Sequence, residues 1–255
     1  MNILDKFRLN GKKALVTGGS RGLGKVAALG LAQAGADVAI IATQLQHAEA
    51  AAREIAQQTG VETLAIEADV SDPVAVEKMI DQIIGRWGTL DIAFNNAGIA
   101  TCANAEDIPL ADWKRVMDVN ATGVFLTTQA EAKVMLKQKK GSIINMASMS
   151  AHIANLPQHA AHYAASKAAV LQLSKAMAAE WADRNVRVNV ISPGYHKTEM
   201  AAMFADIMKE WIPRIPMGRI AEAEELAGTV VFLASDASSY MTGSEIVSDG
   251  GYLLW

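Results

Sequence analysis

The chain alternates short runs of apolar and β-branched residues with longer amphipathic stretches. Seven runs predict strands, at residues 14–17, 38–42, 63–68, 90–94, 142–147, 186–192 and 245–249. The longer stretches, with apolar positions at helical spacing, predict helices at 23–34, 46–59, 73–87, 110–138, 161–184 and 222–235. Strands separated by helices of this length imply right-handed crossovers within a parallel sheet. We therefore expect a doubly wound α/β fold, with a seven-stranded parallel sheet and helices on both faces.

Glycine and proline positions agree with these boundaries. Pro73 stands at the first position of a predicted helix, and Gly35 and Gly60 each follow the end of one. No repeat, low-complexity tract or linker interrupts the pattern, so we expect residues 1–255 to form a single domain. Residues 195–220 are the least regular stretch, and a loop of this length inside a compact domain is usually functional. We expect this segment to be a substrate lid.

Composition excludes several classes of protein. Hydrophobic residues make up 51% of the chain and charged residues 20%, which is typical of globular domains. The formal net charge of -4, without clustered lysine and arginine, argues against a nucleic-acid partner. No run of about 18 apolar residues is present, so we expect no membrane partner. Charges at Asp5, Lys6 and Arg8 come before any apolar run, and Cys102 is the only cysteine, so we expect a cytoplasmic protein.

A glycine-rich loop follows the first predicted strand. It reads Thr17-Gly-Gly-Ser-Arg-Gly-Leu-Gly24, and a helical pattern begins at once. Glycines let the backbone turn tightly and approach a pyrophosphate, while the amino end of the next helix attracts its charge. The strand, loop and helix together predict a dinucleotide site in a Rossmann-type domain.

The spacing of these glycines, at 18, 22 and 24, departs from G-x-G-x-x-G and resembles the T-G-x-x-x-G-x-G motif of the short-chain dehydrogenase/reductase family. Further family motifs follow in order over essentially the whole chain: Asn95-Asn96-Ala97-Gly98, Asn120, Ser148, Tyr163-x-x-x-Lys167 and Pro193-Gly194. The resemblance implies an NAD(P)-dependent enzyme that transfers a hydride between a nicotinamide and a carbonyl or secondary alcohol. It also implies a homotetramer.

Four residues form the catalytic group that the resemblance implies. Tyr163 and Lys167 lie four positions apart in a predicted helix, so both side chains project from one face. By resemblance, Tyr163 donates or accepts the proton, Lys167 also holds the cofactor ribose, Asn120 fixes a water that relays protons to Lys167, and Ser148 polarises the substrate oxygen. A nearby ammonium and an oxidised nicotinamide would favour the phenolate, so we expect a lowered pKa for Tyr163.

The serine has two candidates. Reading the fifth strand without gaps places Ser148 at the family's catalytic position, 15 residues before Tyr163. This interval is slightly longer than is usual in the family, and Ser150 would restore the usual one. Strand register is set by the buried pattern whereas loops tolerate insertion, so Ser148 is favoured and a shared role for Ser150 stays open.

The end of the second strand bears on the choice of cofactor. Ala42 stands where NAD-dependent relatives carry an acidic residue for the ribose hydroxyls, and Arg21 can supply a cation for a 2′-phosphate. We therefore favour NADP(H), and NAD(H) remains possible. By resemblance, Asp69 and Val70 should border the adenine and Asn96 the adenosine ribose. The remaining expected cofactor contacts are Gly18, Ser20, Gly22, Leu23, Thr43, Ala97, Gly98, Pro193, Gly194, His196 and Thr198.

Histidines do not indicate a metal site. His152, His159, His162 and His196 are irregularly spaced, with no acidic residue beside them in sequence, so we expect no metal ion. His196 stands where relatives usually carry an aliphatic residue beside the nicotinamide.

Two segments point to a substrate class. Residues 148–158 and the ending 249–255 resemble the polyol dehydrogenase and ketose reductase branch of the family, which implies a polyol or ketose substrate. Ser150, His152, Asn155 and Tyr195 are the expected polar contacts, because a polar substrate needs groups that replace its bonds to water.

Two alternatives stay open. A 3-ketoacyl or other apolar carbonyl substrate is favoured by four residues of the expected lid: Met200, Met203, Met208 and Trp211. A non-catalytic NADP-binding regulatory protein is the alternative from another class, although a pure binder needs no proton relay. The apolar residues 227–255 resemble the dimer-forming surface of tetrameric relatives, and such a surface is costly to leave exposed.

Overall fold

The computed structural model describes residues 2–199 and 206–254. Its seven strands form one parallel sheet in the order β3-β2-β1-β4-β5-β6-β7. The strands are β1 (Lys13–Thr17), β2 (Asp37–Ala42), β3 (Thr63–Glu67), β4 (Ile92–Asn95), β5 (Gly141–Met146), β6 (Val186–Pro193) and β7 (Glu245–Ser248). The predicted strands, their parallel arrangement and the doubly wound fold are confirmed.

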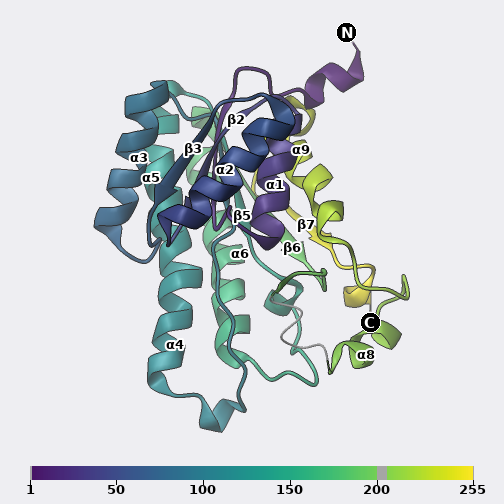
Figure 1. Cartoon of the computed structure of the whole chain (residues 1–255). Coiled ribbons are helices and arrows are strands. Elements are labelled where there is room, and N and C mark those ends of the chain that lie inside the picture. The colour runs from purple at the N-terminus through teal and green to yellow at the C-terminus, as the bar shows by residue number, and fades with distance from the viewer. Residues whose placement is uncertain (1, 200–205, 255) are drawn as a thin grey trace.

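Helices cover both faces of this sheet (Figure 1). The helices are α1 (Gly22–Gln33), α2 (Leu45–Thr59), α3 (Pro73–Trp87), α4 (Leu110–Met117), α5 (Gly123–Gln138), α6 (Ala161–Trp181), α8 (Met208–Trp211) and α9 (Ala227–Ala234). Helices α1, α2 and α9 pack on one face, and α3, α5 and α6 pack on the other. The short helix α8 lies near the C-terminus, away from the sheet (Figure 1).

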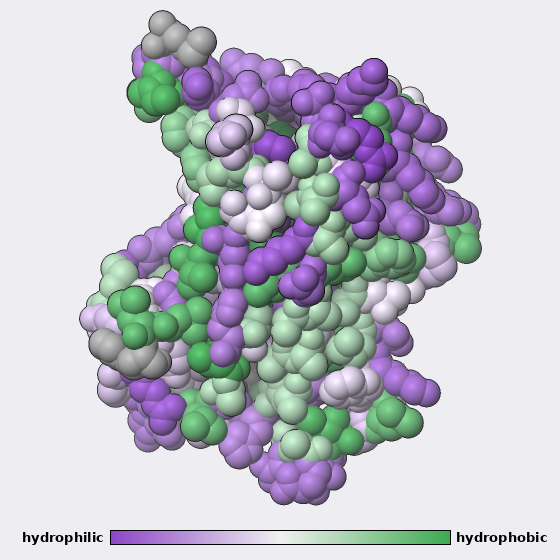
Figure 2. Space-filling view, turned by 180° about the vertical axis from the view of Figure 1, so that it is seen from behind, coloured by the Kyte–Doolittle hydropathy of each residue, from purple (hydrophilic) through white to green (hydrophobic). Residues whose placement is uncertain are grey.

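The surface mixes both kinds of residue. Seen from behind, hydrophilic residues dominate the upper part of the molecule, and hydrophobic residues gather across the middle (Figure 2). Among the described helices, none combines the length and the apolar character that crossing a bilayer requires.

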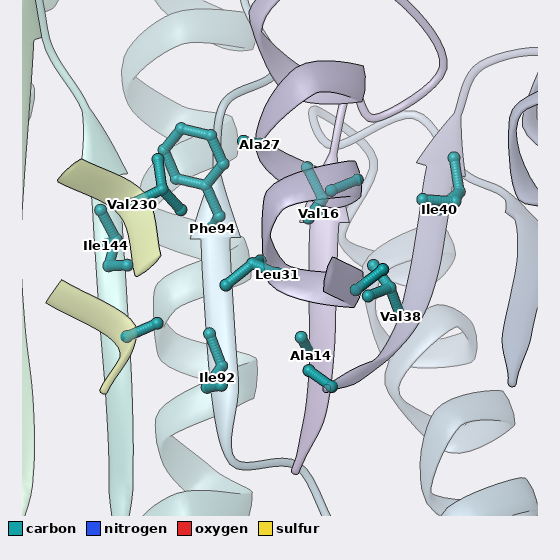
Figure 3. Packing of buried hydrophobic residues seen from close by; sticks show 14 of the residues in the cluster. Ala14, Val16, Ala27, Leu31, Val38, Ile40, Ile92, Phe94, Ile144 and Val230 are labelled. Atoms are coloured by element: carbon teal, nitrogen blue, oxygen red, sulfur yellow. The ribbon is translucent and has the colours of Figure 1, made fainter. Parts of the chain in front are cut away.

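Two apolar layers sandwich the sheet because successive strand residues point to opposite faces. In β1, Ala14 and Val16 pack against α1 and α9, whereas Leu15 packs against the other face. Figure 3 shows the first layer, where Leu31 of α1 and Val230 of α9 lie over the central strands. Strands buried on both faces read as continuous apolar runs, which is why the sequence pattern located them.

The long helix predicted over residues 110–138 is divided. A five-residue π-helix, η3 (Asp118–Thr122), separates α4 from α5 and contains Asn120. Apolar spacing cannot reveal one wider turn, because the flanking residues keep helical geometry on either side. The predicted helix at 222–235 likewise begins as a 3₁₀ turn, η7 (Ala223–Leu226), before α9.

The strand order places the topological switch point, where a ligand crevice is expected, between β1 and β4. From β1 the chain winds outward to β2 and β3, and then returns to β4 on the other side of β1. At such a switch point the connections from neighbouring strands diverge, and ligands bind outside the carboxyl ends of the strands. The glycine-rich loop after β1 and the segment starting at Asn96 after β4 both lie at this edge.

A buried polar cluster lies between the carboxyl ends of β4 and β5 and the helices α5 and α6. The side-chain amide of Asn95 donates to Glu131 Oε2 at 2.9 Å and to Asn145 Oδ1 at 3.0 Å. Asn145 donates in turn to Ser174 Oγ at 2.9 Å. Glu131 is fully buried, and burial raises its pKa to about 8 against the opposing hydrogen bond from Asn95. The Glu131 carboxyl is therefore mainly neutral at pH 7.

Glu131 gives the fold a distinctive pH dependence. An unfolded glutamate has a pKa near 4.3, so between about pH 5 and 8 the folded chain holds a proton that the unfolded chain releases. The free energy of unfolding should therefore fall with rising pH, and Glu131→Gln should remove this fall, which amounts to at most about 1.4 kcal/mol per pH unit. Urea unfolding of both proteins at several pH values measures the difference. The exposed Glu49→Gln is the control, and parallel profiles for wild type and Glu131→Gln would contradict the assignment.

Candidate active site

The glycine-rich loop begins the site at the end of β1. Gly18 and Gly22 have φ values of 62° and 53°, in the left-handed region that favours glycine. At Gly24 a Cβ atom would lie 2.2 Å from the Gly18 carbonyl oxygen, so only glycine lets the first turn of α1 approach the loop. The backbone therefore turns from β1 into the amino end of α1, as pyrophosphate binding requires.

Two side chains tie this loop to the segment after β4. The Thr17 hydroxyl accepts hydrogen bonds from the backbone N–H groups of Asn96, at 3.0 Å, and Ala97, at 3.1 Å. The Asn96 side-chain amide donates to the carbonyl oxygens of Thr17, at 3.1 Å, and Gly18, at 3.2 Å. The Asn96 side-chain amide therefore holds the glycine-rich loop. The predicted contact between Asn96 and the cofactor ribose would have to use other atoms of this residue.

The residues that the sequence predicted near the adenine lie at and just after the ends of β2 and β3. Ala42 is buried at the end of β2, and the neighbouring Thr43 is exposed. The Asp69 carboxylate accepts hydrogen bonds from the backbone N–H and the hydroxyl of Ser71. Arg21 lies in the loop with a largely exposed side chain, paired with Glu199 at 3.3 Å.

Tyr163 and Lys167 lie on the first turns of α6. The Lys167 ammonium donates to the Met146 carbonyl oxygen at 2.8 Å and lies 5.7 Å from the centre of the Tyr163 ring. Burial lowers the pKa of Lys167 to about 8. Burial also raises the pKa of Tyr163, against the opposing effect of a hydrogen bond with Ser148. The lowered tyrosine pKa expected from the sequence is therefore not produced by the protein's own groups, because desolvation of the phenolate outweighs them.

Ser148 faces Tyr163, and Ser150 lies behind it. The Ser148 hydroxyl hydrogen-bonds to the Tyr163 phenol, accepts from the backbone N–H of Ser150 at 3.1 Å and lies 3.1 Å from the Ser150 hydroxyl. Both serines are buried. The two residues thus share one hydrogen-bonded unit, with Ser148 as the member next to the phenol.

Asn120 is fixed by the wider turn of η3. Its side-chain oxygen accepts from the backbone N–H of Ile99 at 2.8 Å, and its amide donates to the Ile99 carbonyl at 2.9 Å and to Ser166 Oγ at 3.1 Å. Asn120 therefore joins the segment after β4 to α6. A Cβ atom on Gly98 would lie 3.3 Å from Asn120 Oδ1 and 3.6 Å from Lys167 Nζ, so glycine leaves this approach to the lysine uncrowded.

A pocket of about 150 Å³ lies beside Ser148 and Tyr163. Three of the four predicted substrate contacts line it: Ser150, Asn155 and Tyr195. The fourth, His152, does not, because its imidazole pairs with Glu245 of β7 at 2.6 Å. The other lining residues are Leu23, Ala100, Cys102, Met149, Gln158, Ala160, Pro193, Gly194, His196, Thr198 and Trp211.

A family model described as "Enoyl-(Acyl carrier protein) reductase" matches residues 18–253. The chain belongs to the short-chain dehydrogenase/reductase family. This match confirms the resemblance predicted from the motifs, and it makes the chain an oxidoreductase of the class that acts on alcohol and ketone groups.

Two relatives named for their activities are similar to the chain over nearly its whole length. A sorbose reductase of Candida albicans is 44% identical, with 98% of this chain and 90% of that protein covered. An NADP-dependent mannitol dehydrogenase of Alternaria alternata is 41% identical, with 98% of this chain and 95% of that protein covered.

Solved structures of the family agree with the fold. A short-chain type dehydrogenase/reductase from Mycobacterium marinum is 50% identical, with a TM-score of 0.97 and 99% of each chain covered. A gluconate 5-dehydrogenase from Burkholderia cenocepacia, solved in complex with NADP and tartrate, is 37% identical, with a TM-score of 0.95 and both chains covered completely.

The sequence motifs left the pocket residue Gln158 unassigned, whereas Trp211 was expected in the lid. Gln158 and Trp211 line the pocket together, although 53 residues separate them, and no local pattern joins them. Met208 packs in the apolar cluster beside the pocket, whereas Met200 and Met203 lie outside the described residues. No group of three or more possible metal ligands occurs within 2–199 and 206–254.

His196 is buried at the pocket wall, where the family pattern usually has an aliphatic side chain. Its Nδ1 lies 3.2 Å from the Gly194 carbonyl oxygen, and burial lowers its pKa. Its Nε2 has no hydrogen-bond partner among residues 2–199 and 206–254. A neutral imidazole with one unpaired nitrogen carries no charge, so it resembles an aliphatic side chain more closely than a charged imidazole would. This explains how a histidine fits at this position.

Proposed function

We propose that the chain is an NADP(H)-dependent oxidoreductase that interconverts a polyol and a ketose. The observation that carries the proposal is the grouping of Ser148, Tyr163 and Lys167 beside a pocket, at the same sheet edge as the glycine-rich loop. The similarity to a sorbose reductase and a mannitol dehydrogenase supports the substrate class. A pocket that includes Asn155, Gln158 and the Tyr195 phenol suits a hydroxylated substrate.

Each catalytic residue has a role that its contacts support. Bound at the crevice, NADPH supplies the hydride and NADP⁺ accepts it. The Ser148 hydroxyl polarises the substrate oxygen, and the Tyr163 phenol donates its proton to that oxygen during reduction and takes it back during oxidation. Lys167 places a positive charge beside the phenol, and Asn120 fixes the segment after β4 against α6.

The protonation states favour reduction at neutral pH. Tyr163 holds its proton because burial raises its pKa, so the phenol is ready to donate. Alcohol oxidation needs the phenolate, which the charge of an oxidised nicotinamide and Lys167 together would stabilise. We therefore propose that oxidation accelerates with rising pH more strongly than reduction does.

NADP(H) is the favoured cofactor. Ala42 leaves the end of β2 without a carboxylate that would repel a 2′-phosphate, and Arg21 provides an exposed cation in the adjacent loop. The Alternaria alternata relative is named as NADP-dependent, and the Burkholderia cenocepacia structure contains NADP. Position 43 is a threonine and not an arginine that would bind the 2′-phosphate, so NAD(H) can serve as a second cofactor.

An apolar carbonyl, such as a 3-ketoacyl group, is the second candidate substrate. Leu23, Met149, Ala160 and the Trp211 ring all line the pocket and would bury an acyl chain. A non-catalytic binding protein is disfavoured. Cofactor binding alone does not need Ser148 or Tyr163, yet both lie in one group with Lys167 and Asn120.

We also propose a cytoplasmic homotetramer, with residues 195–220 acting as a lid. A free, exposed Cys102 suits a reducing compartment. Strand β7 forms one edge of the sheet, and Val247 is 40% exposed there. Trp113 on α4 and Phe125 on α5 are also exposed. Association between subunits would bury these apolar surfaces. Sedimentation velocity at micromolar concentration tests the assembly, and a stable monomer would contradict it.

A substrate panel tests the proposed function directly. Oxidation of NADPH and of NADH is followed separately with ketohexoses, ketopentoses and a 3-ketoacyl thioester. We expect kcat/KM to be highest for NADPH with a ketose, because the pocket amides pair with hydroxyl groups and Ala42, at the end of β2, has no carboxylate to repel a 2′-phosphate. A higher kcat/KM for the thioester would reverse the substrate assignment, and a preference for NADH would reverse the cofactor assignment.

Removal of one hydroxyl tests the role of Tyr163. Tyr163→Phe should lower kcat by about 10²–10⁴-fold, the usual contribution of a general acid, while the Kd for NADPH changes little. Initial rates and fluorescence titration measure the two quantities. Tyr240→Phe removes the same atom from a fully exposed ring and serves as the control. Unchanged kcat in Tyr163→Phe would eliminate the mechanism.

A further inference from the structure

One wall of the pocket consists of two stacked aromatic rings. The rings of Tyr195 and Trp211 have centres 3.9 Å apart and are inclined by 5°, and Tyr252 meets Tyr195 edge-on at 5.4 Å. Trp211 and Tyr252 belong to a small apolar cluster that is separate from the two layers of the sheet. The wall thus joins the end of β6, helix α8 and the C-terminal segment.

Gln158 binds the polar atoms of both stacked rings. Its Nε2 donates to the Tyr195 hydroxyl oxygen at 2.9 Å, and its Oε1 accepts from the Trp211 indole N–H at 2.9 Å. Asn155, from the same loop, donates to the Tyr195 hydroxyl at 3.3 Å. A carboxamide presents a donor and an acceptor on one carbon, so a single side chain can engage both rings.

These contacts leave part of each amide available inside the pocket. Each side-chain nitrogen has a second hydrogen, and Asn155 also has its amide oxygen; no residue of 2–199 or 206–254 engages these atoms. Both side chains are partly exposed and line the pocket. A substrate hydroxyl both donates and accepts, so it can pair with them, whereas an apolar chain would strip their water without replacing it.

We propose that Asn155 and Gln158 form a subsite for substrate hydroxyl groups beyond the reacting carbon, and that Gln158 determines specificity for polyhydroxylated substrates. This inference rests on the proposed function. The stacked rings hold the two amides in position, and the amides form hydrogen bonds with the hydroxyl groups of the substrate.

The test compares two carbonyl substrates in Gln158→Leu, which keeps the size of the side chain and removes its hydrogen bonds. For a ketohexose we expect KM to rise at least about tenfold with kcat within about threefold, since a site built to pair with hydroxyls discriminates by binding. For hydroxyacetone, which lacks the remote hydroxyls, kcat/KM should stay within about threefold. Gln57→Leu, on the exposed face of α2, is the matched control and should match wild type with both substrates.

A second variant guards against loss of the pocket wall. Asn155→Ala leaves both bonds from Gln158 to the stacked rings in place and removes the other amide of the subsite, so KM for the ketohexose should again rise selectively. Equal losses with both substrates, in both variants, would show a purely structural role and overturn the subsite. Unchanged kinetics would overturn it as well. In either case a wild-type enzyme active on ketohexoses leaves the proposed function standing, whereas a wild-type enzyme inactive on all ketoses overturns both.

Discussion

The site depends on the tie between the carboxyl ends of β1 and β4. One hydroxyl, on Thr17, accepts two backbone N–H groups, and one amide, on Asn96, donates to two carbonyl oxygens of the glycine-rich loop. These strands are neighbours in the sheet but lie some 80 residues apart in the chain. Loss of either side chain would leave partly buried backbone groups unpaired, which costs more than the hydrogen bonds contribute when they form. Two motifs that look independent in the sequence are therefore one structural unit.

From this tie a short series of contacts leads to the proposed catalytic residues. The segment after β4 continues to Gly98 and Ile99, and Ile99 is held by Asn120 from the wider turn of η3. Asn120 in turn contacts Ser166 of α6, one residue before Lys167. The dinucleotide loop and the Tyr163 helix are thus connected through backbone and amide contacts. Such a chain of contacts fixes Tyr163 relative to the glycine-rich loop, as the proposed oriented transfer of a hydride and a proton requires.

The sequence predicted most of the fold because strands buried on both faces and amphipathic helices leave strong periodic patterns. Glycine spacing and the Tyr163–Lys167 interval also indicated residues that the structure brings to the same edge of the sheet. The sequence could not predict the π-helix around Asn120, since one wider turn leaves the apolar pattern unchanged. Nor could the sequence show that Gln158 lines the pocket and His152 does not. The His152 imidazole pairs with Glu245, whereas the Gln158 amide bonds to Trp211. Those outcomes depend on contacts between segments far apart in the chain.

The direction in which the protein shifts the pKa of Tyr163 could not be predicted from the sequence either. Charge alone suggested a lowered value, but burial acts in the opposite direction and dominates. Burial was not visible from a residue pattern that shows only which face of the helix Tyr163 and Lys167 share.

We propose that a hydride passes from NADPH to a ketose carbonyl bound in this pocket. The most direct measurement follows the label from NADPH that carries deuterium at the transferable position of the nicotinamide. Mass spectrometry of the polyol should show one deuterium on the carbon that was the ketone. Consumption of NADPH without deuterium on that carbon, or the absence of any polyol, would contradict the account.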